Sequence, residues 1–271
     1  MIKGLVLNTI FKEYRNKTLI PIFFVTFAYI LGVSFGLEAM EETIKASGFE
    51  SFFNFKDQRL TFTLTFVQFW TIFICILMGT GLISSDLNNN IVSAFLVLPI
   101  KRSTYLLSRI FGGSLILGLF LLLSISIVFI FNWAQLSTWE YFSKALLCFL
   151  ILFFVSFTSL VIAVFTNFFT SEKLGIFFTS IIFFLIYCSN LYVSIKTSEQ
   201  ILKEGLGLLS SLALVSHSIF PRLGNMVWMG NSLFSPESQS MGDMGYQIGH
   251  FVITSSFWVW CAIKTFNRKD I

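Results

Sequence analysis

Residues that could do chemistry gather in one polar stretch, residues 84–109, which lies between two long apolar runs. Asp86 stands near its start, and the basic residues Lys101, Arg102 and Arg109 stand near its end. Charges of opposite sign on one short segment are typical of a surface that docks on a partner, because complementary charges fix the register of an interface. The same pattern also suits a connector that only satisfies its own backbone at a membrane surface.

Patterns for catalysis and metal binding are missing from the rest of the sequence. No G-x-x-x-x-G-K-[ST] motif occurs, so the chain does not bind ATP through a P-loop. The only histidines, His217 and His250, have no carboxylates near them in the sequence that would complete a metal site or a proton relay. The four cysteines fall inside apolar runs without ligand spacing and are expected to be buried packing residues. We expect no enzymatic activity and no cofactor in this chain.

The polar stretch itself has a helical pattern. One face of a helix starting near residue 84 is apolar and consists of Leu87, Ile91, Ala94, Phe95 and Leu98. Ser84, Ser85 or Asp86 is suited to cap its start, and Pro99 disfavours helical geometry at Leu98. We therefore predict a short amphipathic helix in residues 84–102, a segment that we call the elbow.

The composition is that of a membrane protein. Apolar residues make up 55% of the 271 residues and charged residues only 12%, about half the share of a soluble domain. Apolar runs of 18 or more residues recur, each long enough to cross the hydrocarbon core as a helix. The basic residues are scattered along the edges of these runs, which excludes a nucleic-acid interface. The sequence predicts an all-α polytopic membrane protein with a single domain, residues 1–271.

Six spans are expected, at residues 19–37, 61–83, 103–131, 141–166, 174–194 and 246–265. Residues 1–18 precede them and are expected to form a helix in the membrane interface, in which Glu13 and Arg15 are candidate contacts for a partner. Simple anchoring by positive charge explains these residues equally well. Within residues 195–246, the apolar pieces 206–219 and 226–234 are too short to cross, and Pro221 separates them. They predict two broken, re-entrant helices on the outer side.

Charge distribution orients the six spans. If both termini are cytoplasmic, the inner segments hold 11 of the 18 lysine and arginine residues but only 4 of the 14 acidic residues. The positive-inside rule therefore places both ends of the chain in the cytoplasm. Charges are nearly absent from the span centres, which disfavours a secondary transporter driven by ions or protons.

The elbow resembles that of permease subunits of type-2 ABC transporters. Where that family carries Glu, Gly, Pro, Ile or Val, Arg, a bulky residue and Lys, this sequence has Asp86, Asn90, Pro99, Ile100, Arg102, Tyr105 and Arg109, without a gap. Asp86 replaces the usual Glu, and Asn90-Ile91 replaces a common Gly-Thr. The subset that the chain most resembles is linked to copper-enzyme maturation and gliding motility.

This resemblance implies a function and a set of partners. The chain would be the membrane subunit of an ATP-driven transporter in the bacterial cytoplasmic membrane, with ATP bound by a separate ATPase subunit. The ATPase-coupling residues would be Glu13, Arg15, Asp86, Asn90, Ile91, Phe95, Leu98, Pro99, Lys101 and Arg102. A non-transporting scaffold or mechanotransmitter driven by the same kind of ATPase fits the sequence as well, and the transported substrate stays open.

One six-span chain of this kind is expected to pair with a second permease copy, identical or homologous. In lipid, helices associate through close packing at small residues. Gly32 and Gly36 form a G-x-x-x-G notch in the first span, and Ser180 and Ser189 are small residues of the fifth. These four are the candidate residues for the dimer seam or for helix packing.

Overall fold

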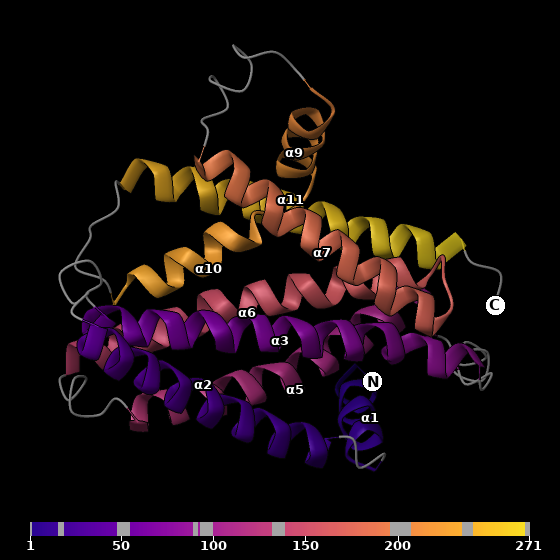
Figure 1. The fold of residues 1–271 in the computed structure, drawn as a ribbon. Helices are drawn as coiled ribbons and strands as arrows, with labels where there is room; N and C mark the ends of the chain where they lie inside the picture. Colours follow the sequence, from indigo (N-terminus) through magenta and orange to yellow (C-terminus); the bar gives the residue numbers. More distant parts are fainter. Residues whose placement is uncertain are drawn as a thin grey trace.

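The computed structural model describes residues 2–15, 19–47, 55–88, 92, 100–131, 139–195, 207–234 and 241–268. Within these ranges all regular secondary structure is helical, with nine helices and no strand (Figure 1). In chain order they are α1 (Ile2–Arg15), α2 (Leu19–Ser47), α3 (Phe55–Asn88), α5 (Arg102–Phe131), α6 (Trp139–Asn167), α7 (Glu172–Ile195), α9 (Leu208–Ile219), α10 (Leu223–Ser232) and α11 (Met241–Arg268).

Five of these helices are long and apolar enough to cross a membrane: α2, α3, α5, α6 and α7. They indicate an α-helical membrane-integral protein, as the composition predicts. Helix α11 occupies the place of the expected sixth span and is 28 residues long, but it is more polar than the other five. On its inward side, Thr254 is buried and Ser255 accepts a hydrogen bond from Thr158 of α6.

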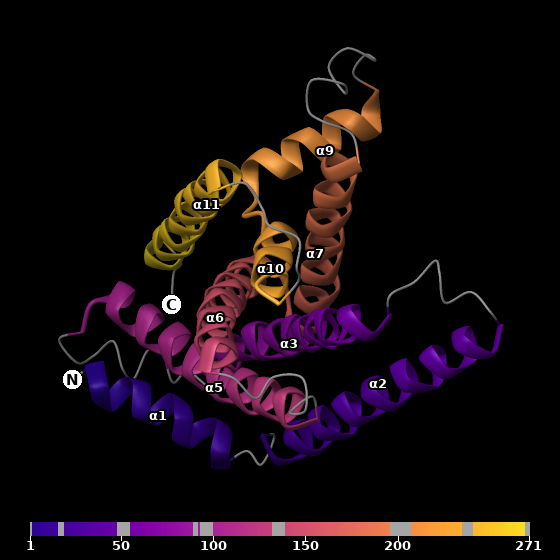
Figure 2. The same cartoon turned by 90° about the vertical axis from the view of Figure 1, so that its left-hand side faces the viewer.

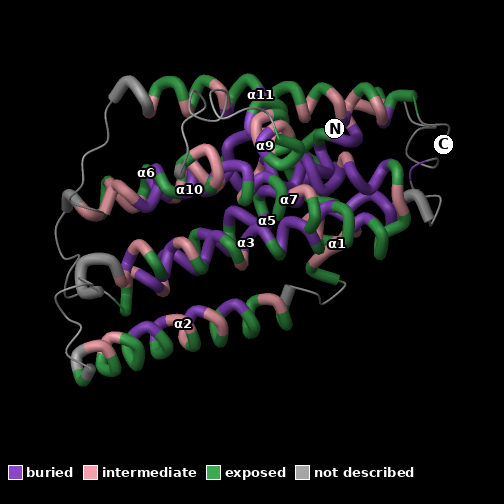
Figure 3. The backbone as a smooth tube through the Cα atoms, turned by 45° about the horizontal axis from the view of Figure 1, so that its top comes forward, coloured by how far each residue is buried: buried purple, intermediate pink, exposed green. Residues whose placement is uncertain are grey.

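The bundle is built around α3, α5 and α6, which pack against one another along their lengths. Figure 3 shows these helices mostly buried, whereas α2 and α11 are exposed along much of their length. Gly79 allows the closest approach within the core: a Cβ atom there would lie 2.5 Å from Cβ of Ala163 on α6. The outward surfaces of the long helices carry many large apolar side chains, as contact with lipid requires.

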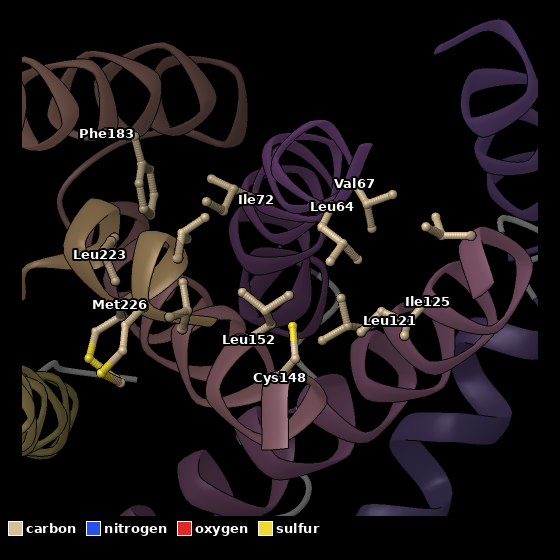
Figure 4. Packing of buried hydrophobic residues seen from close by; sticks show 14 of the residues in the cluster. Leu64, Val67, Ile72, Leu121, Ile125, Cys148, Leu152, Phe183, Leu223 and Met226 are labelled. Carbon is tan, nitrogen blue, oxygen red and sulfur yellow. The ribbon is translucent and has the colours of Figure 1, made fainter. Parts of the chain in front are cut away.

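The broken region expected before the last span contains two short helices, and the second lies among the long helices of the bundle. Helix α9 packs on α7 and lies across the long helices, and the chain then turns at Pro221 into α10. Helix α10 lies among α3, α6, α7 and α11 (Figure 2). Figure 4 shows Leu223 and Met226 of α10 in the apolar cluster that also contains Leu152 and Phe183.

Several helices extend beyond the expected boundaries. Helix α2 continues to Ser47, past the expected end of the first span at residue 37, so Glu38, Glu41 and Glu42 are helical. Helix α3 continues to Asn88, through the position where a new helix was expected to begin. Cys75 and Cys148 are buried as expected, whereas Cys188 is exposed and Cys261 is partly exposed.

Candidate functional site

The elbow begins and ends at described residues, but most of it lies outside them. Asn90, Ile91, Phe95, Leu98 and Pro99 are among the residues that the structure does not describe, so their proposed contact with an ATPase stays a prediction. Two described residues of this segment face inward: Val92 and Ile100 are buried in an apolar cluster with Leu5 of α1 and Leu82 of α3. The elbow is therefore packed against the bundle at these two points.

Four of the predicted coupling residues, two in α1 and two at the end of the elbow, are at least partly exposed. Arg15 is exposed in the last turn of α1, and Glu13 is partly exposed. Lys101 is exposed, and Arg102 begins α5 with its side chain partly exposed. These four charged side chains therefore lie where a partner can reach them.

Asp86 is different, because its side chain is completely buried. It belongs to the last turn of α3 and does not cap a new helix, since α3 continues to Asn88. Its Oδ1 atom lies 2.6 Å from Nζ of Lys12, and its Oδ2 atom lies 2.7 Å from Nη2 of Arg109. The hydroxyl of Tyr105 donates a third bond, 2.5 Å long, to Oδ2. Asp86 therefore pairs with three side chains of its own chain in this structure.

Arg109 and Tyr105 belong to α5 and lie one turn apart on its buried side. Nε of Arg109 donates to the Tyr105 hydroxyl at 3.3 Å, and Nη1 donates to Oγ1 of Thr9 at 3.0 Å. The Arg109 side chain is only 3% exposed, so its charge requires the carboxylate beside it. We call the five residues Thr9, Lys12, Asp86, Tyr105 and Arg109 the Asp86 cluster.

The Asp86 cluster joins three helices that are far apart in the sequence. Thr9 and Lys12 come from α1, Asp86 from the end of α3, and the other two from the start of α5. Helix α1 also packs directly on α5: a Cβ atom at Gly112 would lie 2.7 Å from Cβ of Thr9. The N-terminal helix, which was expected to lie in the interface with Glu13 and Arg15 as candidate partner contacts, is thus bound to the helices on both sides of the elbow.

The end of α11 lies beside the same cluster. The Tyr105 ring is stacked with Phe266 at 6.2 Å between ring centroids, and Phe266 also contacts Phe168 at 5.6 Å. Arg102 donates to the backbone carbonyl of Asn267. Four helices, α1, α3, α5 and α11, therefore meet where the elbow joins the bundle.

The Asp86 cluster is suited to holding helices together and is not suited to catalysis. Both oxygens of Asp86 already accept bonds from cationic or phenolic groups, which leaves neither directed at a substrate. A general base needs an accessible lone pair within hydrogen-bond reach of the proton that it removes. Among the described residues, no group of three or more His, Cys, Asp and Glu side chains is placed to hold a metal ion.

Sequence reasoning named Asp86 and placed Tyr105 and Arg109 in the same motif, but it did not bring them together. It missed Thr9 and Lys12 as members of the cluster. The usable signal was an acid at the end of one apolar run and a basic residue early in the next, because a short connection brings two such ends together. No comparable signal in the sequence connects α1 to this pair.

The candidate packing residues divide into two groups. Gly32 and Gly36 face open space, since nothing lies within 4 Å of a Cβ atom placed on either, and Ser180 is exposed on α7. Ser189 is 3% exposed and its hydroxyl donates to the carbonyl of Ile186. Ser189 therefore packs between helices of this chain, and Gly32, Gly36 and Ser180 remain candidates for a seam.

The chain was also compared with known proteins. None of the family models, curated proteins or solved structures matches it. The likeness of residues 86–109 to ABC permeases therefore rests on the sequence motif, and the geometry of the Asp86 cluster is the structural observation to set beside it.

Proposed function

We propose that this chain is the membrane subunit of an ATP-driven ABC transporter and that its elbow receives the force of a separate ATPase subunit. The observation that carries the proposal is the Asp86 cluster, which fastens α1, α3 and α5 together at the base of the elbow. A segment that is pushed by a partner moves distant helices only if it is rigidly connected to them. Since the sequence has no P-loop, the energy would come from that partner.

The mechanism follows from which helices the cluster joins. Closure of the ATPase would press on the elbow, and α3 and α5 would tilt together because Asp86 and Arg109 hold their ends in contact. Helix α1 would move with them through Lys12 and Thr9. The exposed residues Arg15 and Lys101 would complete the docking surface. Tilting of these helices would then change access to a path through the membrane.

Six spans with both termini in the cytoplasm is the topology that we propose. Helix α11 would be the sixth span, since 28 residues extend about 42 Å as an α-helix. Its outward side carries large apolar residues, namely Val252, Ile253, Phe257 and Trp260, which suit contact with lipid. The distribution of lysine and arginine then places the Asp86 cluster at the cytoplasmic end of the bundle.

We further propose that two permease copies, identical or homologous, form the transporter. Helix α2 contributes little buried surface to its own chain and presents Gly32 and Gly36 without neighbours. In lipid, such a notch allows another helix to approach closely. Ser180 on the exposed side of α7 is the second candidate contact.

Replacing Phe95 by aspartate tests the docking surface. We expect the protein to insert normally but to lose most of its bound ATPase, because a carboxylate replaces an apolar anchor. The measurement is the amount of ATPase that co-purifies with the tagged chain and its stimulated ATP hydrolysis. Phe142→Asp is the control, because Phe142 is 60% exposed at the start of α6, at the other end of the bundle. Full ATPase binding by Phe95→Asp contradicts docking at the elbow.

Cysteine labelling tests the topology. In a chain without its native cysteines, we expect cysteines at Ser198 and Ser238 to react with an impermeant reagent added to intact, right-side-out membranes. Ser198 precedes the α9–α10 pair and Ser238 follows it, and this pair would return to the outer side without crossing. A cysteine at Ser171, in the short link between α6 and α7, should react only after the membrane is opened. Labelling of Ser198 and Ser238 from opposite sides contradicts six spans.

A further inference from the structure

A second polar network lies where α9 turns into α10, away from the Asp86 cluster. Its centre is Arg222, the residue before the first turn of α10, whose side chain is only 7% exposed. Nη1 donates to Oε1 of Gln247 at 3.1 Å, and Nη2 donates to the Tyr246 hydroxyl at 3.1 Å. The guanidinium also lies 4.7 Å from the centre of the Tyr246 ring.

All of these partners of Arg222 are neutral. Among the side chains that the structure describes, which do not include that of Asp243, no carboxylate lies within ion-pair distance of Arg222, whereas Arg109 and Arg59 each have one. Nε of Arg222 is buried and has no hydrogen-bond partner. Burial of an arginine without a counter-charge is strongly unfavourable, and an unpaired donor on the same group adds to that penalty. The described side chains therefore supply no counter-charge to Arg222 and no acceptor for its Nε.

One further unpartnered donor lies close to the start of α10. Nδ2 of Asn190, on α7, is buried without a partner and lies 3.1 Å from where a Cβ atom of Gly224 would be. Gly224 is in the first turn of α10, so this amide points at the helix N-terminus. The free backbone N–H groups and the dipole of an N-terminal turn attract negative charge.

The two histidines of the chain complete the surroundings without adding charge. Nδ1 of His217 lies 3.0 Å from Oδ1 of Asn190, and its ring is stacked on that of His250 at 6.4 Å. Burial, and then the charge of Arg222, lower the pKa of His217 to about 4, so this imidazole is neutral at physiological pH. Arg222 is thus the single full charge of the group formed by Asn190, His217, Arg222, Gly224 and His250.

We propose that this group binds an oxyanion, a phosphate or a carboxylate, between Arg222, the Asn190 amide and the first turn of α10. The oxyanion would accept from Nε of Arg222 and from Nδ2 of Asn190, the two buried donors of this group that have no partner among the described residues. That this oxyanion represents the class of transported substrate rests on the proposed function. That the group binds an oxyanion does not. A phospholipid headgroup offers the same chemistry as an anion from solution.

The test measures thermal unfolding of the isolated chain in nanodiscs, without any ATPase. One arm adds sodium phosphate or sodium acetate to phosphatidylcholine discs, with sodium chloride at equal ionic strength as reference. The other arm replaces part of the phosphatidylcholine by phosphatidylglycerol. We expect a rise of about 2–4 °C in the unfolding midpoint in one arm, which identifies the source of the anion. The absence of a rise in both arms overturns the proposal.

Variants assign the effect to the site. Arg222→Gln should remove the rise, whereas Arg268→Gln, which removes an equal charge from the exposed end of α11, should keep it. Asn190→Asp places a carboxylate at the first turn of α10, so it should raise the midpoint without added anion and abolish the response. This variant decides the matter if Arg222→Gln does not fold. A rise that persists unchanged in Asn190→Asp or in a folded Arg222→Gln refutes the site. Full ATPase binding by Phe95→Asp would refute docking at the elbow, but it would leave the result of this anion test unchanged.

Discussion

Replacing Asp86 by asparagine is expected to lower the free energy of unfolding by about 3–5 kcal/mol, because it leaves Arg109 buried without a counter-charge. The carboxylate is fully buried and bonds to Lys12, Tyr105 and Arg109 at once. Lys12 is 21% exposed and can turn toward water, but Arg109 cannot. Most of the loss should therefore come from Arg109. Unfolding of the purified chain in detergent, followed by circular dichroism over a denaturant series, measures the difference.

A matched control and a double variant give this result its meaning. Glu42→Gln removes an acidic side chain that is exposed on α2, and it should change stability by less than about 0.5 kcal/mol. The double variant Asp86→Leu with Arg109→Met removes both charges, and it should be far more stable than Asp86→Asn, since paired removal leaves no orphaned charge. If Asp86→Asn is as stable as Glu42→Gln, the Asp86 cluster does not hold the elbow to the bundle.

A milder variant of the Asp86 cluster separates a structural role from a role in coupling to the ATPase. If the cluster transmits force, a milder change that preserves folding should reduce ATPase stimulation more than ATPase binding. Tyr105→Phe is suitable, because it removes one bond to Asp86 and the acceptor of Arg109 Nε while keeping the ring stacked on Phe266. Equal loss of binding and stimulation would assign the cluster to stability alone.

The long apolar helices could be predicted from the sequence because lipid imposes both length and composition on them. Residues 103–131 were expected to form a span, and α5 covers Arg102–Phe131. The short helices α9 and α10 were also anticipated, since fourteen apolar residues cannot cross and Pro221 must interrupt a helix. These features depend on local sequence and need no knowledge of tertiary contacts.

Helix ends were less predictable, because polar residues do not by themselves end a helix. Ser84, Ser85 and Asp86 are good capping residues, and their presence suggested a new helix start. In the structure, Asp86 is satisfied by Lys12, Tyr105 and Arg109, so its carboxylate has no need of backbone N–H groups, and α3 continues to Asn88. One of these partners, Lys12, lies 74 residues away, beyond the reach of any local pattern.

The burial of α10 among α3, α6, α7 and α11 could also not be predicted from the sequence. Its sequence is short and only moderately apolar, which describes an interface-lying helix as well as a buried one. What buries it is its fit with its neighbours: Gly230 packs against Ile151 and Leu152 of α6, and Asn231 donates to Thr65 of α3. Such complementarity belongs to the assembled bundle, and the charges of Arg222 and Asp86 acquire partners or lack them only there.

Replacing Gly79 by alanine is expected to destabilise the chain by about 1–3 kcal/mol, although alanine favours helix formation over glycine by about 0.5–1 kcal/mol. The added methyl would lie 2.5 Å from Cβ of Ala163 and 3.3 Å from the carbonyl oxygen of Leu160, and neither atom is the end of a flexible side chain. Helices α3 and α6 must therefore separate along the core of the bundle. Unfolding in detergent, under conditions that keep the chain monomeric, measures the loss.

Gly32→Ala is the control that reverses the sign. Nothing lies within 4 Å of a Cβ atom at Gly32, so only the helix propensity changes, and the monomer should be unaffected or slightly more stable. In lipid the same methyl should weaken pairing of two copies if Gly32 lies in the seam, because it prevents the close approach that the notch allows. Cross-linking between cysteines at Ser180 of one copy and of another should fall accordingly. If Gly32→Ala destabilises the monomer as much as Gly79→Ala does, α2 packs inside the chain and cannot supply the seam.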